Sequence, residues 1–221
     1  MKKNILIMGS SGYAKVIIDI IEKQRKYSIS GLIDTFVDIG EETFGYKVLG
    51  SEDDIPELIL SKKIFGLILA IGDNYIREEI YKKIKKIAPT LEFITAIHPS
   101  AIIGKDVVIG NGSAIMGGVI INPSCEISSH CIINTNASVD HDSKIGEFSS
   151  LAPNSCTGGN VVLNEGVVIG IGATILHGIK IGKYSVIGAS ALVNNDVTEF
   201  SVVYGVPAKK IRSRNKSDQY L

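Results

Sequence analysis

Residues 97–197 carry a hydrophobic pattern that repeats every six residues without a slip. Seventeen positions mark the repeat, and all except Thr157 are Ile, Leu or Val. Because Ile, Leu and Val together occupy roughly a quarter of ordinary positions, chance does not produce this run. The marked positions are Ile97, Ile103, Ile109, Ile115, Ile121, Ile127, Ile133, Val139, Ile145, Leu151, Thr157, Leu163, Ile169, Ile175, Ile181, Ile187 and Val193.

A period of six suits neither an α-helix nor a hairpin sheet. It suits a short strand and a tight corner, with one large aliphatic side chain pointing inward on each side of a triangular coil. The residue four places after each mark is mostly small, as at Ala101, Ser113 and Cys125, and suits the corner. Coils of eighteen residues stack at roughly 4.8 Å, so that backbone groups pair up and down. The pattern therefore predicts a parallel β-helix of hexapeptide repeats.

The first 95 residues follow another pattern, in which apolar strands alternate with amphipathic helices. This alternation predicts a small Rossmann-like α/β nucleotide-binding domain. The predicted strands cover 4–8, 29–33, 46–49, 65–71 and 91–95. The predicted helices cover 13–26, a segment capped by Ser51 and Asp54 that ends near residue 60, and 75–87.

These patterns divide the chain into three parts. We assign residues 1–95 to the α/β domain, 96–205 to the β-helix and 206–221 to a basic C-terminal tail. The last residues, 215–221, are expected to be frayed, as chain ends often are.

Composition narrows the possible partners and the compartment. With 23 basic and 23 acidic residues, the chain has no net field that would draw it to nucleic acid or to a membrane surface. The apolar run at 4–8 is too short for a signal peptide or a membrane span, so we expect a cytoplasmic protein. Three cysteines argue against a disulfide framework, and Cys125 and Cys131 fall on corner positions where packing is their expected role.

Small and polar residues follow the predicted strands of the first domain. The turn Gly9, Ser10, Ser11, Gly12 can cradle phosphate with its N–H groups, although it lacks the third glycine of a dinucleotide fingerprint. Asp34 ends the second strand, and Asp73 and Asn74 end a later one. An ordinary turn and a plain helix cap remain alternative readings. Together, at one edge of the sheet, these residues favour a nucleotide-sugar site.

Two of the four histidines, His141 and His177, fall two residues after a mark, at an outward position. They are two coils apart, so they are expected to stand roughly 9–10 Å from each other. His141 has Asp140 and Asp142 as neighbours, and a carboxylate beside an outward imidazole suits general-base catalysis. A surface histidine without a role is the alternative. No histidine or cysteine cluster has the usual zinc spacing, so we expect no metal.

Several motifs together closely resemble the bacterial sugar O/N-acetyltransferase family. Its members include sialic acid O-acetyltransferases and bacillosamine-pathway N-acetyltransferases of UDP-linked 4-amino sugars. The resemblance implies a left-handed coil, a homotrimer, acetyl-CoA as co-substrate, a nucleotide-sugar held by the N-terminal domain and active sites between neighbouring coils. The motifs are GSSGYAKVIIDI at 9–20, AIGDN at 70–74, NT at 134–135, VDHD at 139–142, IGEF at 145–148, GGN at 158–160 and GVPAK at 205–209.

The resemblance also implies residue roles. His141 would be the general base and Asp142 would orient it, while the N–H of Gly159 would stabilise the oxyanion. Thr157, the break in the aliphatic register, would mark a local departure of the coil where pantetheine passes. Nucleotide contacts would come from Gly9, Ser10, Ser11, Gly12, Asp34, Asp73 and Asn74, and the acceptor amine would lie near Asn134. Contacts with acetyl-CoA would come from Ser150, Gly158, Gly159, Gly205, Lys209 and Lys210.

Two positions depart from the family. Tyr13 and Ser150 stand where many relatives have histidine, so one contact to the nucleotide-sugar and one near pantetheine can differ. The expected activity is N-acetylation of a nucleotide-linked 4-amino-4,6-dideoxy sugar, UDP-linked, for a surface glycan. O-acetylation of sialic acid is one alternative, and a non-catalytic, trimeric nucleotide-sugar-binding module is another.

Overall fold

The computed structural model describes residues 2–220, which divide into two compact units. One unit contains residues 2–72 and 76–99, and the other contains residues 73–75 and 100–220.

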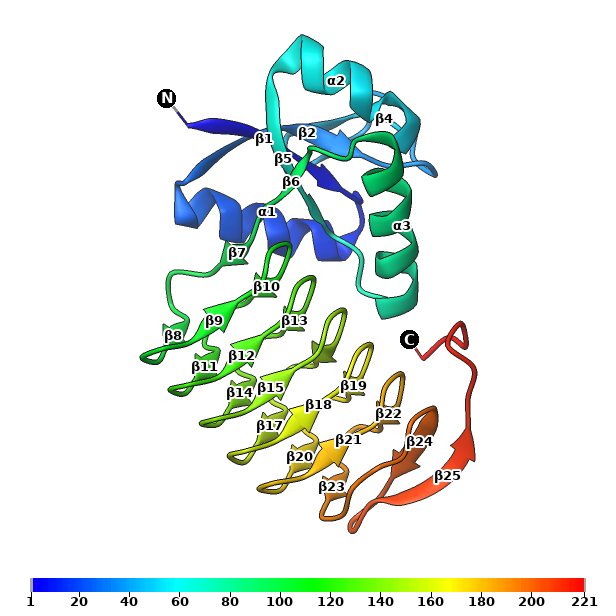
Figure 1. The fold of residues 1–221 in the computed structure, drawn as a ribbon. Helices are drawn as coiled ribbons and strands as arrows, with labels where there is room; N and C mark the ends of the chain where they lie inside the picture. Colours follow the sequence, from blue (N-terminus) through cyan, green and yellow to red (C-terminus); the bar gives the residue numbers. More distant parts are fainter. Residues whose placement is uncertain (1, 221) are drawn as a thin grey trace. The chain divides into compact units, whose positions relative to one another are not determined.

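The first unit is built on a six-stranded sheet in the order β3-β4-β2-β1-β5-β6 (Figure 1). All neighbouring strands are parallel except β3, which forms a hairpin with β4. The strands are β1 (Lys3–Met8), β2 (Tyr27–Ile33), β3 (Glu42–Thr43), β4 (Tyr46–Gly50), β5 (Ile64–Leu69) and β6 (Glu92–Phe93). The helices are α1 (Gly12–Gln24), the 3-10 turn η1 (Glu52–Asp54), α2 (Ile55–Lys62) and α3 (Asn74–Ile87).

The core of this unit explains why β1 is apolar from Ile5 to Met8. Leu6 and Met8 pack in one cluster with Ile55 of α2 and Ile84 of α3. Because side chains alternate along a strand, Ile5 and its neighbours in register point to the opposite face, where α1 lies. A strand covered on both faces has no polar side, which is typical of parallel sheets.

The predicted strands and helices of this unit are confirmed within a few residues. Ser51 donates to Asp54 Oδ2 from both its N–H (2.8 Å) and its hydroxyl (3.0 Å), which confirms the cap before α2. The pattern missed β3, whose two residues are too few to show an alternation. The last strand, β6, is also shorter than predicted.

The second unit is a parallel β-helix whose strands form three sheets. Each strand from β7 to β23 has two residues and ends on a marked position, so the hexapeptide prediction is confirmed. The strands are β7 (Ala96–Ile97), β8 (Ile102–Ile103), β9 (Val108–Ile109), β10 (Ala114–Ile115), β11 (Ile120–Ile121), β12 (Glu126–Ile127), β13 (Ile132–Ile133), β14 (Ser138–Val139), β15 (Lys144–Ile145), β16 (Ser150–Leu151), β17 (Cys156–Thr157), β18 (Val162–Leu163), β19 (Val168–Ile169), β20 (Thr174–Ile175), β21 (Lys180–Ile181), β22 (Val186–Ile187) and β23 (Leu192–Val193).

The corners explain the small residues four places after each mark. Ser143 and Ser149 are fully buried, and each accepts an N–H from the next coil at 3.1 Å, from Val161 and Val167 respectively. Cys125 and Cys131 are also fully buried at corners, which confirms their packing role. From Asp106 to Ser190 the preceding corner residue has a positive φ, for example 57° at Asp142.

The C-terminal segment is ordered, so the expectation of frayed ends is wrong for residues 215–220, and Leu221 lies outside the described residues. β24 (Ser201–Tyr204) extends the β22 sheet, and β25 (Lys209–Ser213) pairs with β24 in antiparallel fashion. Arg214 is buried and donates to the carbonyls of Tyr184 and Asp218. Tyr220 packs against Val168, Val186 and Val202. Anchoring by a buried arginine and an aromatic ring keeps this segment from fraying.

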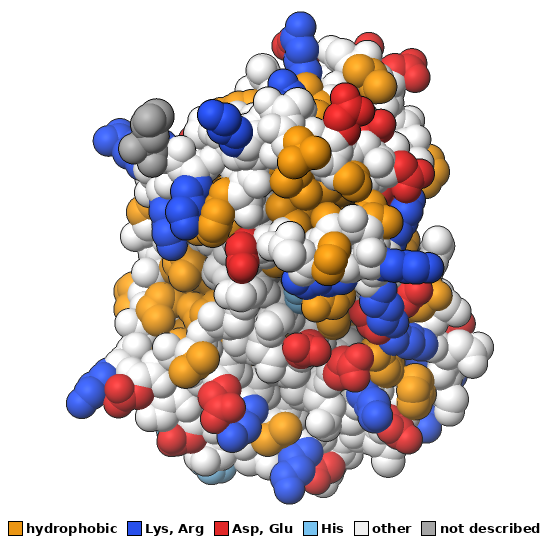
Figure 2. Space-filling view, turned by 45° about the horizontal axis from the view of Figure 1, so that its top comes forward, with side chains coloured by type: hydrophobic (Ala, Val, Ile, Leu, Met, Phe, Trp, Pro, Cys, Tyr) orange, Lys and Arg blue, Asp and Glu red, His pale blue; other side chains and the backbone are white. Residues whose placement is uncertain are grey.

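The surface mixes charges of both signs. On the face drawn in Figure 2, basic and acidic side chains lie beside one another. Among residues 2–220, no helix is long and apolar enough to cross a membrane.

Candidate functional site

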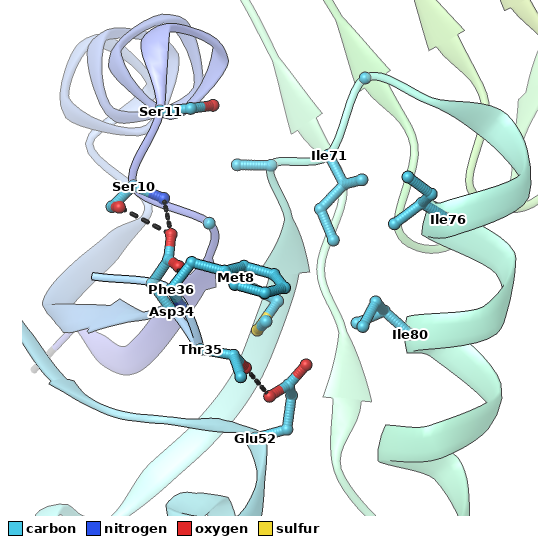
Figure 3. Close-up of a pocket in the computed structure, with 13 residues that line it drawn as sticks. Met8, Ser10, Ser11, Asp34, Thr35, Phe36, Glu52, Ile71, Ile76 and Ile80 are labelled. Carbon is cyan, nitrogen blue, oxygen red and sulfur yellow. Dashed lines mark hydrogen bonds between the residues drawn. The ribbon is translucent and has the colours of Figure 1, made fainter. Parts of the chain in front are cut away.

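A pocket of about 240 Å³ opens in the first unit, at the carboxyl ends of β1, β2 and β5 (Figure 3). The chain runs from β1 outward to β4 and then returns to β5 on the other side of β1. This reversal of strand order is where α/β sheets bind their ligands. Four of the predicted nucleotide contacts, Gly9, Ser10, Ser11 and Asp34, line the pocket.

Asp34 braces the turn after β1. Its Oδ2 accepts the N–H of Ser10 at 3.0 Å and the Ser10 hydroxyl at 2.7 Å, and its Oδ1 accepts the N–H of Phe36 at 2.9 Å. Gly9 is required in this turn because its φ is +109° and a Cβ would lie 2.8 Å from the carbonyl oxygen of Ala70. The two residues together hold the ends of β1, β2 and β5 in register around the pocket.

The start of α1 suits an anion. Ser11 is its N-cap residue, its side chain makes no capping bond, and the first turn of the helix carries no acidic residue. The free N–H groups and the helix dipole at such an end favour negative charge. Gly12 begins the helix and does not line the pocket.

Asp73 and Asn74 do not line the pocket either. They group with the second unit, where the N–H of Asn74 donates to the Tyr220 hydroxyl at 2.7 Å and its Nδ2 donates to the carbonyl of Val167 at 3.2 Å. Asn74 is 4% exposed. These contacts of Asn74 are structural, and its proposed role at the nucleotide is not supported by the pocket.

The pocket contains residues that the sequence patterns did not single out. Met8, Ile71, Ile76 and Ile80 supply apolar walls, and Phe36, Thr35 and Glu52 complete the lining. Glu52 lies inside the Ser51–Asp54 cap, which we interpreted only as a helix start. The sequence could have indicated Glu52 as a pocket residue, because it follows β4 at the same edge of the sheet as Asp34.

The catalytic candidates meet at one corner of the β-helix. His141 Nδ1 lies 2.7 Å from Asp142 Oδ2, and the two side chains are about half exposed. Because a carboxylate only accepts, Nδ1 carries the proton and Nε2 keeps a lone pair. The pKa of His141 is raised from its usual value, chiefly by the hydrogen bond to Asp142; desolvation opposes this rise, and the charges of Asp140 and Asp142 add to it.

His141 and His177 lie closer than predicted. Val139, Thr157 and Ile175 pair in register, so His141, Gly159 and His177 follow equivalent strand ends on successive coils. The ring centroids of the two histidines are 6.2 Å apart, not the roughly 9–10 Å of two coils. The reason is Gly159 between them, since a Cβ there would lie only 2.5 Å from His141 Nε2. The imidazole leans over the glycine backbone.

The N–H of Gly159 is available at this place. Among the backbone hydrogen bonds of residues 2–220, none uses it as a donor, whereas the neighbouring N–H groups of Gly158 and Asn160 bond to Ile175 and His141. An unused N–H beside Nε2 is what an oxyanion needs.

Thr157 does not mark a departure of the coil, so that expectation is wrong. The strands stay in register through Thr157, whose side chain is buried. Its hydroxyl accepts the N–H of Asp140 at 3.2 Å, while Asp140 Oδ1 accepts Asn122 Nδ2 at 2.6 Å and the N–H of His141 at 2.8 Å. The polar residue therefore anchors the segment that leads into His141.

The remaining predicted residues are spread over the second unit. Asn134 follows β13 and accepts the N–H of Thr135 at 2.8 Å, and Ser150 lies in β16 of the same sheet. Gly158 precedes Gly159, and a Cβ there would press on the backbone of His177. Gly205 follows β24 with a φ of +101°, and Lys209 and Lys210 are exposed on β25. Residues 2–220 include no group of three His, Cys, Asp or Glu placed to hold a metal ion.

Two family matches cover parts of the chain. Residues 4–84 match the family described as the PglD N-terminal domain, and residues 160–195 match the bacterial transferase hexapeptide family.

Named relatives extend over both units. The chain is 30% identical over 177 residues to GDP-perosamine N-acetyltransferase from Escherichia coli O157:H7, which covers 78% of each protein. It is 33% identical over 120 residues to UDP-N-acetylbacillosamine N-acetyltransferase from Bacillus subtilis (strain 168), where the match covers 52% of this chain and about half (51%) of that relative.

A solved structure agrees with the fold of nearly the whole chain. PerB from Caulobacter crescentus, in complex with CoA and GDP-perosamine, superposes with a TM-score of 0.87 at 33% identity, covering 94% of this chain and 96% of that one. The chain therefore belongs to the bacterial sugar acetyltransferase family of hexapeptide-repeat transferases, which joins a PglD-type α/β domain to a left-handed parallel β-helix.

Proposed function

We propose that this protein transfers the acetyl group of acetyl-CoA to the 4-amino group of a nucleotide-linked 4-amino-4,6-dideoxy sugar, with His141 as general base. The observation that carries the proposal is the 2.7 Å contact between His141 Nδ1 and Asp142, which leaves Nε2 free above Gly159. The named relatives that act on GDP-perosamine and on a bacillosamine nucleotide support the class of substrate.

The proposed step is an aminolysis of a thioester. The sugar amine attacks the carbonyl carbon of acetyl-CoA, and Nε2 of His141 accepts the proton that the amine loses. The C–S bond then breaks, CoA leaves as the thiol after taking up a proton, and an amide remains on the sugar. Asp142 keeps Nδ1 protonated and stabilises the imidazolium while it exists.

The N–H of Gly159 is proposed to stabilise the negative charge on the carbonyl oxygen during this step. The Cβ position of Gly159 lies 2.5 Å from Nε2, and the N–H of this residue has no acceptor among the described residues. A preorganised donor of this kind is worth a factor of about 10²–10³ in rate. Asn134 is proposed to lie near the amine.

The two substrates are assigned to different residues. Ser10 and Ser11, which line the pocket at the edge of the sheet, and the start of α1 directly after them are proposed to hold the phosphates of the nucleotide. The acetyl-CoA contacts are proposed at Ser150, Gly158, Gly205, Lys209 and Lys210, where the two exposed lysines suit the phosphates of CoA.

We further propose a homotrimer in the cytoplasm, where acetyl-CoA is made. The outward residues of the β8–β23 sheet, which leads into the His141 corner, are all uncharged, whereas the β9–β21 sheet exposes the ion pair Glu126–Lys144. Ile102 is 62% exposed on this uncharged row, which suits burial against a second copy. The row is Ile102, Ile120, Ser138, Cys156, Thr174 and Leu192.

The test is thiol release from acetyl-CoA with a panel of nucleotide-linked amino sugars. We expect His141→Ala to lose at least about a hundredfold in kcat while still binding the nucleotide. His177→Ala is the matched control, because this ring lies in the same register and no carboxylate stands beside it in sequence. Unchanged turnover in His141→Ala, or an equal loss in both variants, would contradict the assignment. Nucleotide binding without turnover on any sugar would favour a binding module instead.

A further inference from the structure

The pocket of the first unit contains a buried carboxylate, Glu52, whose side chain is 5% exposed. The hydroxyl of Thr35 donates to Glu52 Oε2, and Lys83 Nζ lies 3.7 Å from the same oxygen. Thr35 and Lys83 thus both contact the same carboxylate oxygen, Oε2. Figure 3 shows the other oxygen, Oε1, directed into the cavity.

Glu52 is only partly compensated where it lies. Lys83 is 43% exposed and is closer to Asp53, at 3.3 Å, than to Glu52. A buried carboxylate costs several kcal/mol unless its oxygens are well supplied with donors. Oε1 can therefore accept hydrogen bonds from the donors of a ligand that enters this pocket.

The walls of the pocket suit a flat ring. Figure 3 shows Phe36 and Met8 on one side of the cavity and Ile71, Ile76 and Ile80 on the other. Phe36 is 96% exposed, so its ring offers an apolar surface that a ligand in the pocket can cover. A base that lies between Phe36 and the isoleucines buries this surface and presents its polar edge to Glu52.

The chemistry of a carboxylate selects among the bases. Guanine offers two adjacent donors, N1–H and the 2-amino group, and the two lone pairs of Glu52 Oε1 can accept both. Uracil offers one N–H between two carbonyl oxygens, so a carboxylate that approaches it meets two other acceptors. A repulsive contact of this kind discriminates as effectively as an attractive one.

We propose that Glu52 binds the N1–H and 2-amino edge of guanine, and that the nucleotide carrier of the sugar is GDP. The inference rests on the proposed function, because it names the base of the same nucleotide-linked substrate. It replaces the UDP carrier expected from the sequence, where the Ser51–Asp54 segment was interpreted only as a helix cap.

The experiment measures the affinity of the full chain for GDP, inosine diphosphate and UDP by calorimetry. Inosine diphosphate lacks only the 2-amino group of guanine. A bidentate contact to a base is worth about 1–3 kcal/mol, or about 5- to 150-fold in affinity. We therefore expect GDP to bind at least about tenfold more tightly than UDP and about fivefold or more tightly than inosine diphosphate.

Two variants separate Glu52 from its surroundings. Glu52→Gln replaces one acceptor by an NH₂ donor, so the preference for GDP over inosine diphosphate should fall to less than twofold. Asp53→Asn removes the same charge from the next residue, a carboxylate that is 76% exposed and pairs with the same lysine, and should keep the wild-type preference.

Each outcome decides between the two proposals. A wild-type preference for UDP, or equal loss of preference in both variants, overturns the inference about guanine and leaves acetyl transfer to a nucleotide sugar intact. Absence of binding for all three nucleotides contradicts the proposed function as well. If Glu52→Gln does not fold, the wild-type comparison of GDP with inosine diphosphate and UDP decides alone.

Discussion

Replacing Gly159 by alanine tests the geometry of the proposed base without removing it. A Cβ at position 159 would lie 2.5 Å from His141 Nε2 and 2.6 Å from Cε1, where ordinary contact begins at 3.4 Å. The ring must therefore move by about 0.9 Å. Alanine is compatible with the repeat itself, since Ala189 holds the same position two residues after a mark.

A displacement of this size is large for catalysis. A misplacement of about 1 Å can cost about a hundredfold in rate, which is about 2.7 kcal/mol. The ring cannot avoid it by turning freely, because its Nδ1 is held by Asp142 at 2.7 Å. We therefore expect kcat of Gly159→Ala to fall about a hundredfold. The affinity for the nucleotide should stay as in the wild type, because the nucleotide pocket lies in the first unit.

The assay is steady-state thiol release, with calorimetry for nucleotide binding and circular dichroism for folding. Gly117→Ala is the matched control, since Gly117 holds the same position of the repeat in another coil. This variant should keep its activity. The reasoning is refuted if Gly159→Ala turns over within about twofold of the wild type, because the imidazole then does not work from the place where it lies.

Three further predictions concern single contacts. His141 is a base only above its raised pKa, so kcat/KM of the wild type should fall as the pH falls. Asp142→Asn lowers this pKa, so in a pH–rate profile the fall should begin at a lower pH, and the plateau rate should be lower than in the wild type. Thr157→Val removes the acceptor of the Asp140 N–H and should cost about 1 kcal/mol, a Tm decrease of about 2–4 °C by calorimetry. Arg214→Ala removes buried donors to two carbonyls and should lower Tm by about 4–8 °C, whereas a frayed tail would give no change.

The β-helix could be predicted from the sequence because its physics is local and repeated. Each strand end from β7 to β23 except Thr157 carries one inward aliphatic residue, and pairs such as Ile127 with Ile145 stack identical side chains. A six-residue period has few other structural solutions, so the register alone predicts which side chains point outward. The outward position of His141 and its neighbour Asp142 followed directly.

The nucleotide pocket was less accessible to sequence reasoning because distant segments build it. Asp34 was found because it ends a strong apolar strand, at an edge where ligands bind. Glu52 and Phe36 follow no periodic pattern, and their meeting depends on how the β2 and β4 ends are placed in three dimensions. The anchoring of Arg214 by Tyr184 likewise joins residues thirty positions apart, which no local pattern indicates.

Departures from a strict repeat are where the β-helix is most informative. Thr157, which breaks the aliphatic register, and Gly159 both lie in the coil next to His141, and each affects that histidine. The Thr157 hydroxyl holds the backbone of Asp140, and the missing side chain of Gly159 lets the imidazole lean over a free N–H. A repeat that needed only stability would place an aliphatic residue at 157, because a buried hydroxyl adds little to a core. Thr157, the one exception to the aliphatic register, is therefore best explained by the needs of the base, and the Thr157→Val and Gly159→Ala variants separate its contribution from that of Gly159.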